Sequence, residues 1–426
     1  YIRKTDNSDS EAVEWLDKDV TRPVARFLRN WVIDGNVNAR RASLFTPVFP
    51  LRNQIRNFKI GFTSDSVSLS KIRYVAGRSD FEISGSLSNI RRALSGNSRS
   101  PLRINLHMQS DTIDVNQLAA AFFAGAAYSA KKDSLDLTLS DTDNDEELQS
   151  QIENLHSGLE STGPLLIPMN VDANLTVKTD NIIYSDLLLH NMSGGVQVFR
   201  GAVNLNNLSA SSDVGSIDIS ALYAAPDTSS MNFGFGMQTR GFNIERFLQL
   251  VPAVDSILPL LGDMGGIINA DMAATCDIQP NMDIDIPSLR AALKIHGDSL
   301  TLLDPETFKT VSKWLFFKNK NRNLIDSMSV EILVEDSQLK VFPFSFNFDR
   351  YKLGVLGNND FNMNYNYHIA VLKSPIPFKF GVNITGTPDN MKIRLGGSKF
   401  KKGMDVRSVS VVDTTRVNLI RQISSV

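Results

Sequence analysis

Residues 171–177 read VDANLTV, and apolar and polar side chains alternate along this stretch without a break. Every second residue is apolar, from Val171 to Val177, and the residues between them are polar. This alternation is typical of a β-strand with one buried face and one face toward water, as in antiparallel sheets. Residues 231–237 and 378–384 follow the same rule. The sequence therefore predicts a mainly β fold with few helices.

Residues 342–348, FPFSFNF, carry a phenylalanine at every second position. The alternation predicts that four aromatic rings share one strand face: Phe342, Phe344, Phe346 and Phe348. Two interpretations of this face are open. It lines an apolar groove, or it packs against a helix predicted up to Phe317 to make an ordinary core. Residues 330–334 alternate less cleanly, because Leu333 falls on the face that Glu331 makes polar.

Four helices are predicted, over residues 13–31, 114–128, 244–251 and 305–317. Asp304 precedes a proline and a glutamate, which is a strong signal for a helix start. Asp114 and Gln117 have the spacing of a capping box, and Asn243 precedes the third helix. The N-terminal helix is expected to bend at Pro23.

An internal repeat is indicated by five apolar positions that recur with a constant shift of 136 residues. The three sets are Val67, Leu69, Ile72, Phe81 and Ile83, then Val203, Leu205, Leu208, Ile217 and Ile219, then Leu339, Val341, Phe344, Leu353 and Val355. Alternating strands align with one another easily, so equal spacing alone can arise by chance. Two equal shifts and two equivalent helices, at 114–128 and 244–251, favour a real repeat. Repeated units of one sheet bury a continuous apolar surface that no single unit buries alone.

Composition sets limits on the class of protein. The chain has 426 residues, 44 Lys plus Arg and 46 Asp plus Glu, so a nucleic-acid binder with a basic excess is not expected. The single cysteine, Cys276, excludes an internal disulfide. No apolar run reaches the roughly 18 residues of a membrane span, and no signal peptide is present. The chain begins with Tyr1, so we expect a fragment from which any anchor has been removed.

Signals for catalysis and cofactors are weak. No two of the five histidines have metal-ligand spacing, and neither phosphate-binding nor nucleophile-elbow motifs occur. Cys276 is expected to be a small buried residue. Calcium binding by Asp141, Asp143 and Asp145 is disfavoured, because Glu146 stands where a calcium loop of the EF-hand type needs glycine. The sequence predicts a non-enzyme without metal or cofactor.

The expected architecture is a long, twisted antiparallel sheet curved into an open apolar groove and built from repeats. The predicted divisions are an N-terminal helical segment (1–34), a first groove repeat with its helix (35–132), an acidic flexible loop (133–162), a second repeat with its helix (163–260), a third repeat (261–402) and a C-terminal tail (403–426).

Three segments resemble the AsmA-like family. Residues 167–224, from IPMNVDANL to DISALYA, are similar to its repeating unit. FGVNITGTPDNMKIRLGG, residues 380–397, resembles a strand ending common in that family, and the DPETF helix followed by SVEILVEDSQLKVFPFSF resembles its C-terminal region. The resemblance covers roughly Gly35 to Gly397.

The resemblance implies a periplasmic protein of a diderm bacterium, tethered to the inner membrane by an N-terminal helix that this chain lacks. It implies relation to TamB and to bridge-like lipid-transfer proteins, and a role in outer-membrane biogenesis. The implied partners are phospholipid or another acyl lipid and, through the anchor, membranes. Outer-membrane proteins are a further candidate partner, and no nucleic acid is expected. Two alternatives stay open: a scaffold that captures outer-membrane protein strands at a sheet edge, and a β-rich surface adhesin.

Seventeen residues are predicted to line the lipid groove. They are Val171, Leu175, Val177, Val203, Leu205, Met231, Phe233, Phe235, Met237, Phe342, Phe344, Phe346, Phe348, Phe378, Phe380, Val382 and Ile384.

Overall fold

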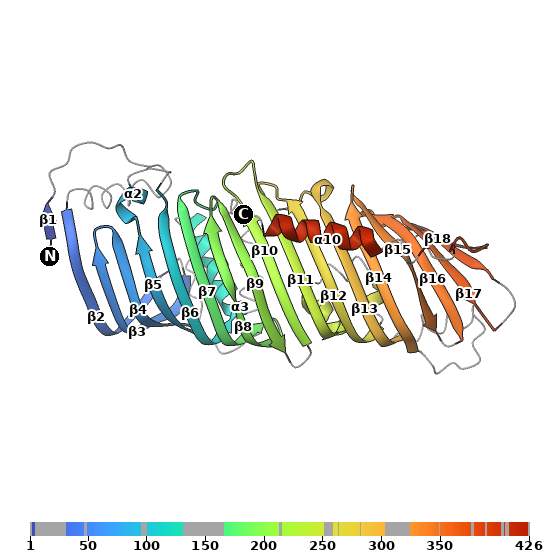
Figure 1. Ribbon diagram of the computed structural model, residues 1–426, viewed down its shortest axis with the longest axis horizontal. Coiled ribbons are helices and arrows are strands. Elements are labelled where there is room, and N and C mark those ends of the chain that lie inside the picture. Colours follow the sequence, from blue (N-terminus) through green and yellow to red (C-terminus); the bar gives the residue numbers. More distant parts are fainter. Residues whose placement is uncertain are drawn as a thin grey trace.

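A computed structural model describes residues 2–4, 31–46, 49–94, 100–130, 166–212, 215–250, 259–262, 264–281, 283–302, 324–348, 350–375, 379–387, 390–401, 404 and 409–424. Its main feature is one long, twisted, groove-like open sheet (Figure 1), which confirms the predicted fold class. The strands are β2 (Trp31–Thr46), β3 (Phe49–Thr63), β4 (Ser66–Ala76), β5 (Ser79–Ser88), β6 (Leu102–Asp114), β7 (Val171–Tyr184), β8 (Leu187–Phe199), β9 (Ala202–Ser212), β10 (Gly215–Ala224), β11 (Asn232–Asn243), β12 (Met264–Asp277), β13 (Arg290–Leu302), β14 (Leu324–Glu335), β15 (Gln338–Phe348), β16 (Tyr351–Asp360), β17 (Tyr365–Lys373), β18 (Gly381–Thr387) and β19 (Asn390–Gly396).

Each of these strands pairs with the next one along the chain, so the spatial order follows the sequence order. A short strand, β1 (Ile2–Lys4), pairs with the start of β2. All pairs are antiparallel except β6 and β7, which run parallel. A parallel pair needs a crossover connection, and α3 (Val115–Ala130) follows β6 at this point.

The described helices are few, as the sequence predicts: α2 (Ile90–Leu94), α3, α5 (Ile244–Leu250), α7 (Pro259–Gly262), α10 (Val409–Ile423) and the single 3₁₀ turn η1 (Ile286–Ser288). The predicted starts of α3 and α5 are confirmed. The Gln117 backbone N–H donates to Asp114 Oδ1 at 2.9 Å, and the Glu245 N–H donates to Asn243 Oδ1 at 2.9 Å. The Gln117 side chain does not complete the capping box, because its Oε1 accepts the Arg78 N–H at 2.7 Å.

Several predicted segments lie outside the described residues. They are the helix over 305–317, most of the N-terminal helical segment and all of the acidic loop. Trp31, which was predicted to end the N-terminal helix, instead begins β2, so this end of the prediction is wrong. The C-terminal tail contains α10, which the sequence patterns did not predict.

The strand boundaries reproduce the 136-residue shift. Strands β4, β9 and β15 are each 11 residues long and begin at Ser66, Ala202 and Gln338. Their partners β5, β10 and β16 are each 10 residues long and begin at Ser79, Gly215 and Tyr351. The two-strand unit therefore recurs three times, with the same strand lengths and the same spacing between the strands along the sequence.

A β-bulge recurs at the same place in each unit. The pairing register shifts between Leu69 and Ile72, between Leu205 and Leu208, and between Val341 and Phe344. In each case one strand has an extra residue opposite its partner. Beyond the bulge, side chains that would have pointed to one face of the sheet therefore point to the other. Lys71 and Asn207 have φ of 44° and 48° in the first two bulges, and Pro343 occupies the third. Proline is tolerated there because a bulge needs no complete ladder of N–H donors.

The outer face of the sheet carries α10, which crosses β10 to β14 in front of the sheet in Figure 1. Val412 and Leu419 of the helix pack with four sheet residues in one buried cluster: Ala273, Ala292, Leu333 and Phe342. Polar contacts fix both ends of the helix. Lys294 Nζ lies 3.4 Å from Glu331 Oε1 and 3.5 Å from Asp413 Oδ2, and Asn204 Nδ2 donates to the Ile423 carbonyl at 3.0 Å.

Two glycines of β11 lie under α10. A Cβ atom at Gly234 would lie 2.7 Å from Ile423 Cγ1, whereas one at Gly236 would have no neighbour closer than 3.5 Å. Only Gly234 is therefore required for the close approach of the helix, since 3.5 Å is an ordinary van der Waals separation.

We expect Asn207→Val to lower the free energy of unfolding by about 1–2 kcal/mol, because a β-branched residue is strained at positive φ. Asn207→Gly is the matched control at the same exposed site and should be close to neutral. Urea unfolding followed by circular dichroism measures both. Equal stability of the two variants would show that the bulge does not need a left-handed residue.

Gly234→Ala should destabilise the protein by about 1–3 kcal/mol through overpacking against Ile423. Gly236→Ala is the control and should be neutral or slightly stabilising, because alanine restricts the unfolded chain more than glycine does. Thermal melting of both variants tests this difference. If both substitutions are tolerated equally, α10 is not seated as described.

Candidate functional site: the apolar face of the sheet

The inner face of the sheet, opposite α10, carries a row of directly paired residues, one from each strand. We call it the apolar row. Each member is the cross-strand partner of the next: Val37, Ile60, Leu69, Gly85, Leu106, Leu175, Val196, Leu205, Ala221, Phe235, Ala274, Ala291, Val334, Leu339, Asn359, Tyr365, Gly386 and Met391. From β2 to β15 every member is aliphatic, aromatic or glycine.

A second apolar row runs beside the first from β9 to β19. Its members are Leu208, Ile219, Met237, Met272, Leu293, Ile332, Val341, Gly357, Tyr367, Ile384 and Ile393. Direct partners in a sheet lie on the same face with Cβ atoms about 5 Å apart, so the two rows form one continuous apolar surface as far as β15.

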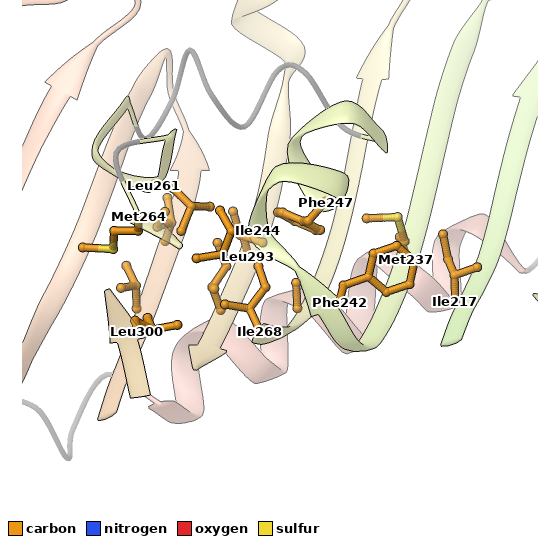
Figure 2. Packing of buried hydrophobic residues seen from close by; sticks show 14 of the residues in the cluster. Ile217, Met237, Phe242, Ile244, Phe247, Leu261, Met264, Ile268, Leu293 and Leu300 are labelled. Carbon is orange, nitrogen blue, oxygen red and sulfur yellow. The ribbon is translucent and has the colours of Figure 1, made fainter. Parts of the chain in front are cut away.

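Helices cover one long side of this surface. We call the strand ends at Asp114, Asn243 and Leu302 the helix rim, because α3 and α5 begin directly after the first two. Residues near this rim are buried: Ile113, Ile182, Leu189, Ala210, Ile217, Phe242, Ile268, Leu300 and Ile325. Figure 2 shows how Ile244 and Phe247 of α5, with Leu261 of α7, lie against Met237, Ile268 and Leu293 of the sheet. This side is an ordinary packed core.

The other long side remains partly open. From β2 to β13 every member of the apolar row except Ala221 keeps part of its surface accessible, and Val37 is 46% exposed. Phe233, two residues from Phe235 on the same face, is 38% exposed. A strip of half-buried apolar side chains therefore follows the sheet beside the packed core.

Most of the predicted groove residues lie on this inner face. Leu175, Leu205 and Phe235 belong to the apolar row, and Met237 and Ile384 belong to the second row. Strand alternation and register place the following on the same face: Val171, Val177, Val203, Phe233, Phe344, Phe346, Phe348 and Val382. Phe380 packs against the main core from just before β18, and Met231 is buried with Val203 in a separate cluster. Phe378 lies outside the described residues.

Phe342 was predicted to share a face with the other three phenylalanines of residues 342–348, and this is wrong. The bulge between Val341 and Phe344 inserts one residue, so Val341 and Phe344 share the inner face while Phe342 points outward. Phe342 packs with Leu333 under α10, and Lys340 Nζ lies 4.9 Å from its ring centroid. On the inner face the rings of Phe344 and Phe346 stack with centroids 6.0 Å apart.

Sequence reasoning missed the N-terminal third of the row: Val37, Ile60, Leu69 and Leu106. The signal was present locally, because Phe58, Ile60 and Phe62 alternate with Lys59 and Gly61. Asn57 and Lys71 both have positive φ, and they break the period within β3 and β4. The alternation is therefore split into runs too short to stand out.

The apolar row is interrupted by polar groups near its C-terminal end. Asn359 is buried, and the Tyr367 hydroxyl donates to its Oδ1 at 2.6 Å. The rings of Tyr365 and Tyr367 lie edge to face, with centroids 6.1 Å apart. Burial raises the pKa of Tyr367 to about 12, with a smaller contribution from Tyr365. These residues form a local network rather than a continuation of the apolar strip.

The described residues hold no group of three or more histidine, cysteine or acidic side chains placed to bind a metal ion. Cys276 is buried, as predicted. Burial is the main cause that raises the pKa of its thiol, and the negative charge of the neighbouring Asp277 raises it further. Within the described part of the chain, no helix is both long and apolar enough to cross a membrane. No protein-family model matches this chain, nor does any curated protein or solved structure.

A titration tests the environment of Tyr367. The folded pKa of Tyr367, about 12, lies above the ordinary tyrosine value of 10.0, so the neutral phenol contributes stability that is complete below pH 10. This contribution is lost as the pH rises from 10 to about 12. Absorbance at the tyrosinate band should show a component with a midpoint near pH 12 that Tyr367→Phe removes. An unchanged titration curve in this variant would contradict the assignment.

Proposed function

We propose that the inner face of the sheet binds the acyl chains of phospholipid or a similar lipid and allows them to move along the sheet. The apolar row carries this proposal, because it presents aliphatic, aromatic or glycine residues on every strand from β2 to β15 without a polar interruption. A compact ligand needs only a local pocket. A surface of this length suits a long hydrocarbon chain, or several of them.

The energetic argument follows from the cost of exposing hydrocarbon. Each methylene group costs about 0.8 kcal/mol in water, so a sixteen-carbon chain costs roughly 13 kcal/mol. Eighteen strands spaced about 4.8 Å apart extend for about 80 Å across the sheet. Within that length, the accessible side chains from Val37 to Ala291 offer the acyl chain apolar contacts at every strand except β5, where the row has Gly85, and β10, where Ala221 is buried.

The partial exposure of the apolar row distinguishes the candidate functions. An adhesin with a filled interior would bury both faces of its strands. Here the helix rim is packed, but Val37 and Phe233 remain accessible on the same face. This arrangement favours a lipid-binding strip, and the polar headgroup would stay in water beside it without a dedicated site.

The cellular setting stays a prediction from the sequence. The AsmA-like resemblance suggests a periplasmic location between inner and outer membranes, an N-terminal anchor and a role in outer-membrane biogenesis. We propose this setting because lipid transfer across an aqueous space requires a continuous apolar path.

Lipid analysis tests the proposed function. The protein, purified without detergent from a cell envelope, should carry phospholipid that organic extraction and mass spectrometry detect. Val37→Asp and Phe233→Asp should each reduce the bound lipid several-fold, because a carboxylate on the strip is costly to desolvate beside hydrocarbon. Both sites are already exposed, so the substitutions should preserve the fold.

Matched controls lie next to each site. Asn38→Asp and Asn232→Asp place the same charge on the opposite face of the same strands, where both residues are exposed, and should leave the lipid content unchanged. Protein without lipid, or an equal loss in variants and controls, would refute the proposal. Circular dichroism of all four variants separates loss of binding from loss of fold.

A further inference from the structure

Strand β19 forms an edge of the sheet, because among the described strands it pairs only with β18. All seven of its residues are exposed, whereas every residue of the neighbouring β18 is buried or half-buried. An edge strand presents a line of unpaired backbone N–H and C=O groups that another strand can complete. The opposite edge already carries an added strand, because β1 pairs with β2 through three residues.

The two faces of β19 differ sharply in chemistry. Met391, Ile393 and Leu395 continue the inner apolar face and are 47%, 55% and 62% exposed. Lys392 and Arg394 lie on the other face, directly opposite the uncharged Thr385 and Asn383 of β18. None of the ion pairs among the described residues involves either cation. The edge therefore has an apolar side and a positively charged side without a counter-charge.

We propose that the β19 edge is a docking site for a strand of another protein in which acidic residues alternate with apolar ones. Such a strand would hydrogen-bond to the free backbone edge and extend the apolar face by one strand. Its two acidic side chains would lie directly opposite Lys392 and Arg394, where opposite charges stabilise a cross-strand pair. This inference does not depend on lipid binding.

Charge argues against a second copy of this chain as the occupant. A symmetric antiparallel pair of β19 strands centred on Ile393 would place Lys392 of one copy directly opposite Arg394 of the other. Like charges in this position destabilise the pair. The same cations that attract an acidic strand therefore oppose self-association.

A peptide titration tests the docking site on the full chain. The acetylated, amidated peptide TVEVEVT has the required alternation and reads the same in both directions, so it fits either strand polarity. We expect it to bind, to protect the backbone amides of residues 390–396 from hydrogen exchange, and to bind more weakly at high salt. The peptide TVKVKVT should bind about tenfold more weakly or less, because two attractive cross-strand pairs become repulsive.

Charge reversal supplies the matched control. The double variant Lys392→Glu, Arg394→Glu should exchange the preference and bind TVKVKVT better than TVEVEVT. Absence of binding by either peptide would mean that the cations only protect the edge from pairing, and would overturn the proposal. Equal binding of both peptides, protection elsewhere in the chain, or concentration-dependent dimerisation through residues 390–396 would overturn it as well.

Discussion

Direct cross-strand pairing is the constraint on which the whole structure depends. Side chains alternate strictly between the two faces of a strand, so a slip of one residue would move apolar groups to the wrong side. From β2 to β15 one face nevertheless stays apolar, because each reversal of the side-chain alternation within a strand is matched in the neighbouring strand or absorbed by a bulge. The bulges at Leu69–Ile72, Leu205–Leu208 and Val341–Phe344 recur with the repeat, which indicates that they are built into the architecture.

The two faces of the sheet are covered by different means. On the inner face, α3 and α5 return from the helix rim and bury only the nearer half of the apolar surface. On the outer face, α10 covers the middle strands, where small residues such as Gly234, Ala273 and Ala292 allow it to approach closely. The half-open strip on the inner face is thus what remains after the described helices have packed.

The fold class was predictable from the sequence because its signal is local. Alternation in residues 171–177 and capping residues such as Asp114 are read within a few positions, and both predictions were confirmed. The assignment of Phe342 failed, because it faces outward at a bulge that only strand pairing reveals. Leu333 does share the face of Glu331, as the sequence predicted, but the helix that buries it, α10, is remote in the sequence. The parallel pairing of β6 with β7 has no local signature either, since it depends on how the chain crosses over. Most of the candidate groove residues were found because they lie in uninterrupted alternating runs, and those beside Asn57 and Lys71 were missed because the runs there are short.

The position of α10 has a consequence for the order of events during synthesis. The strands that α10 covers leave the ribosome first. Phe342 cannot contact Leu419 until the ribosome has synthesised the next 77 residues. At about 5–20 residues per second, this interval lasts roughly 4–15 s. During that time the outer surface of the nascent chain exposes four apolar residues that α10 later buries: Ala273, Ala292, Leu333 and Phe342. A premature stop before residue 409 would leave this apolar surface permanently exposed, so we expect chaperones and proteases to recognise the truncated protein.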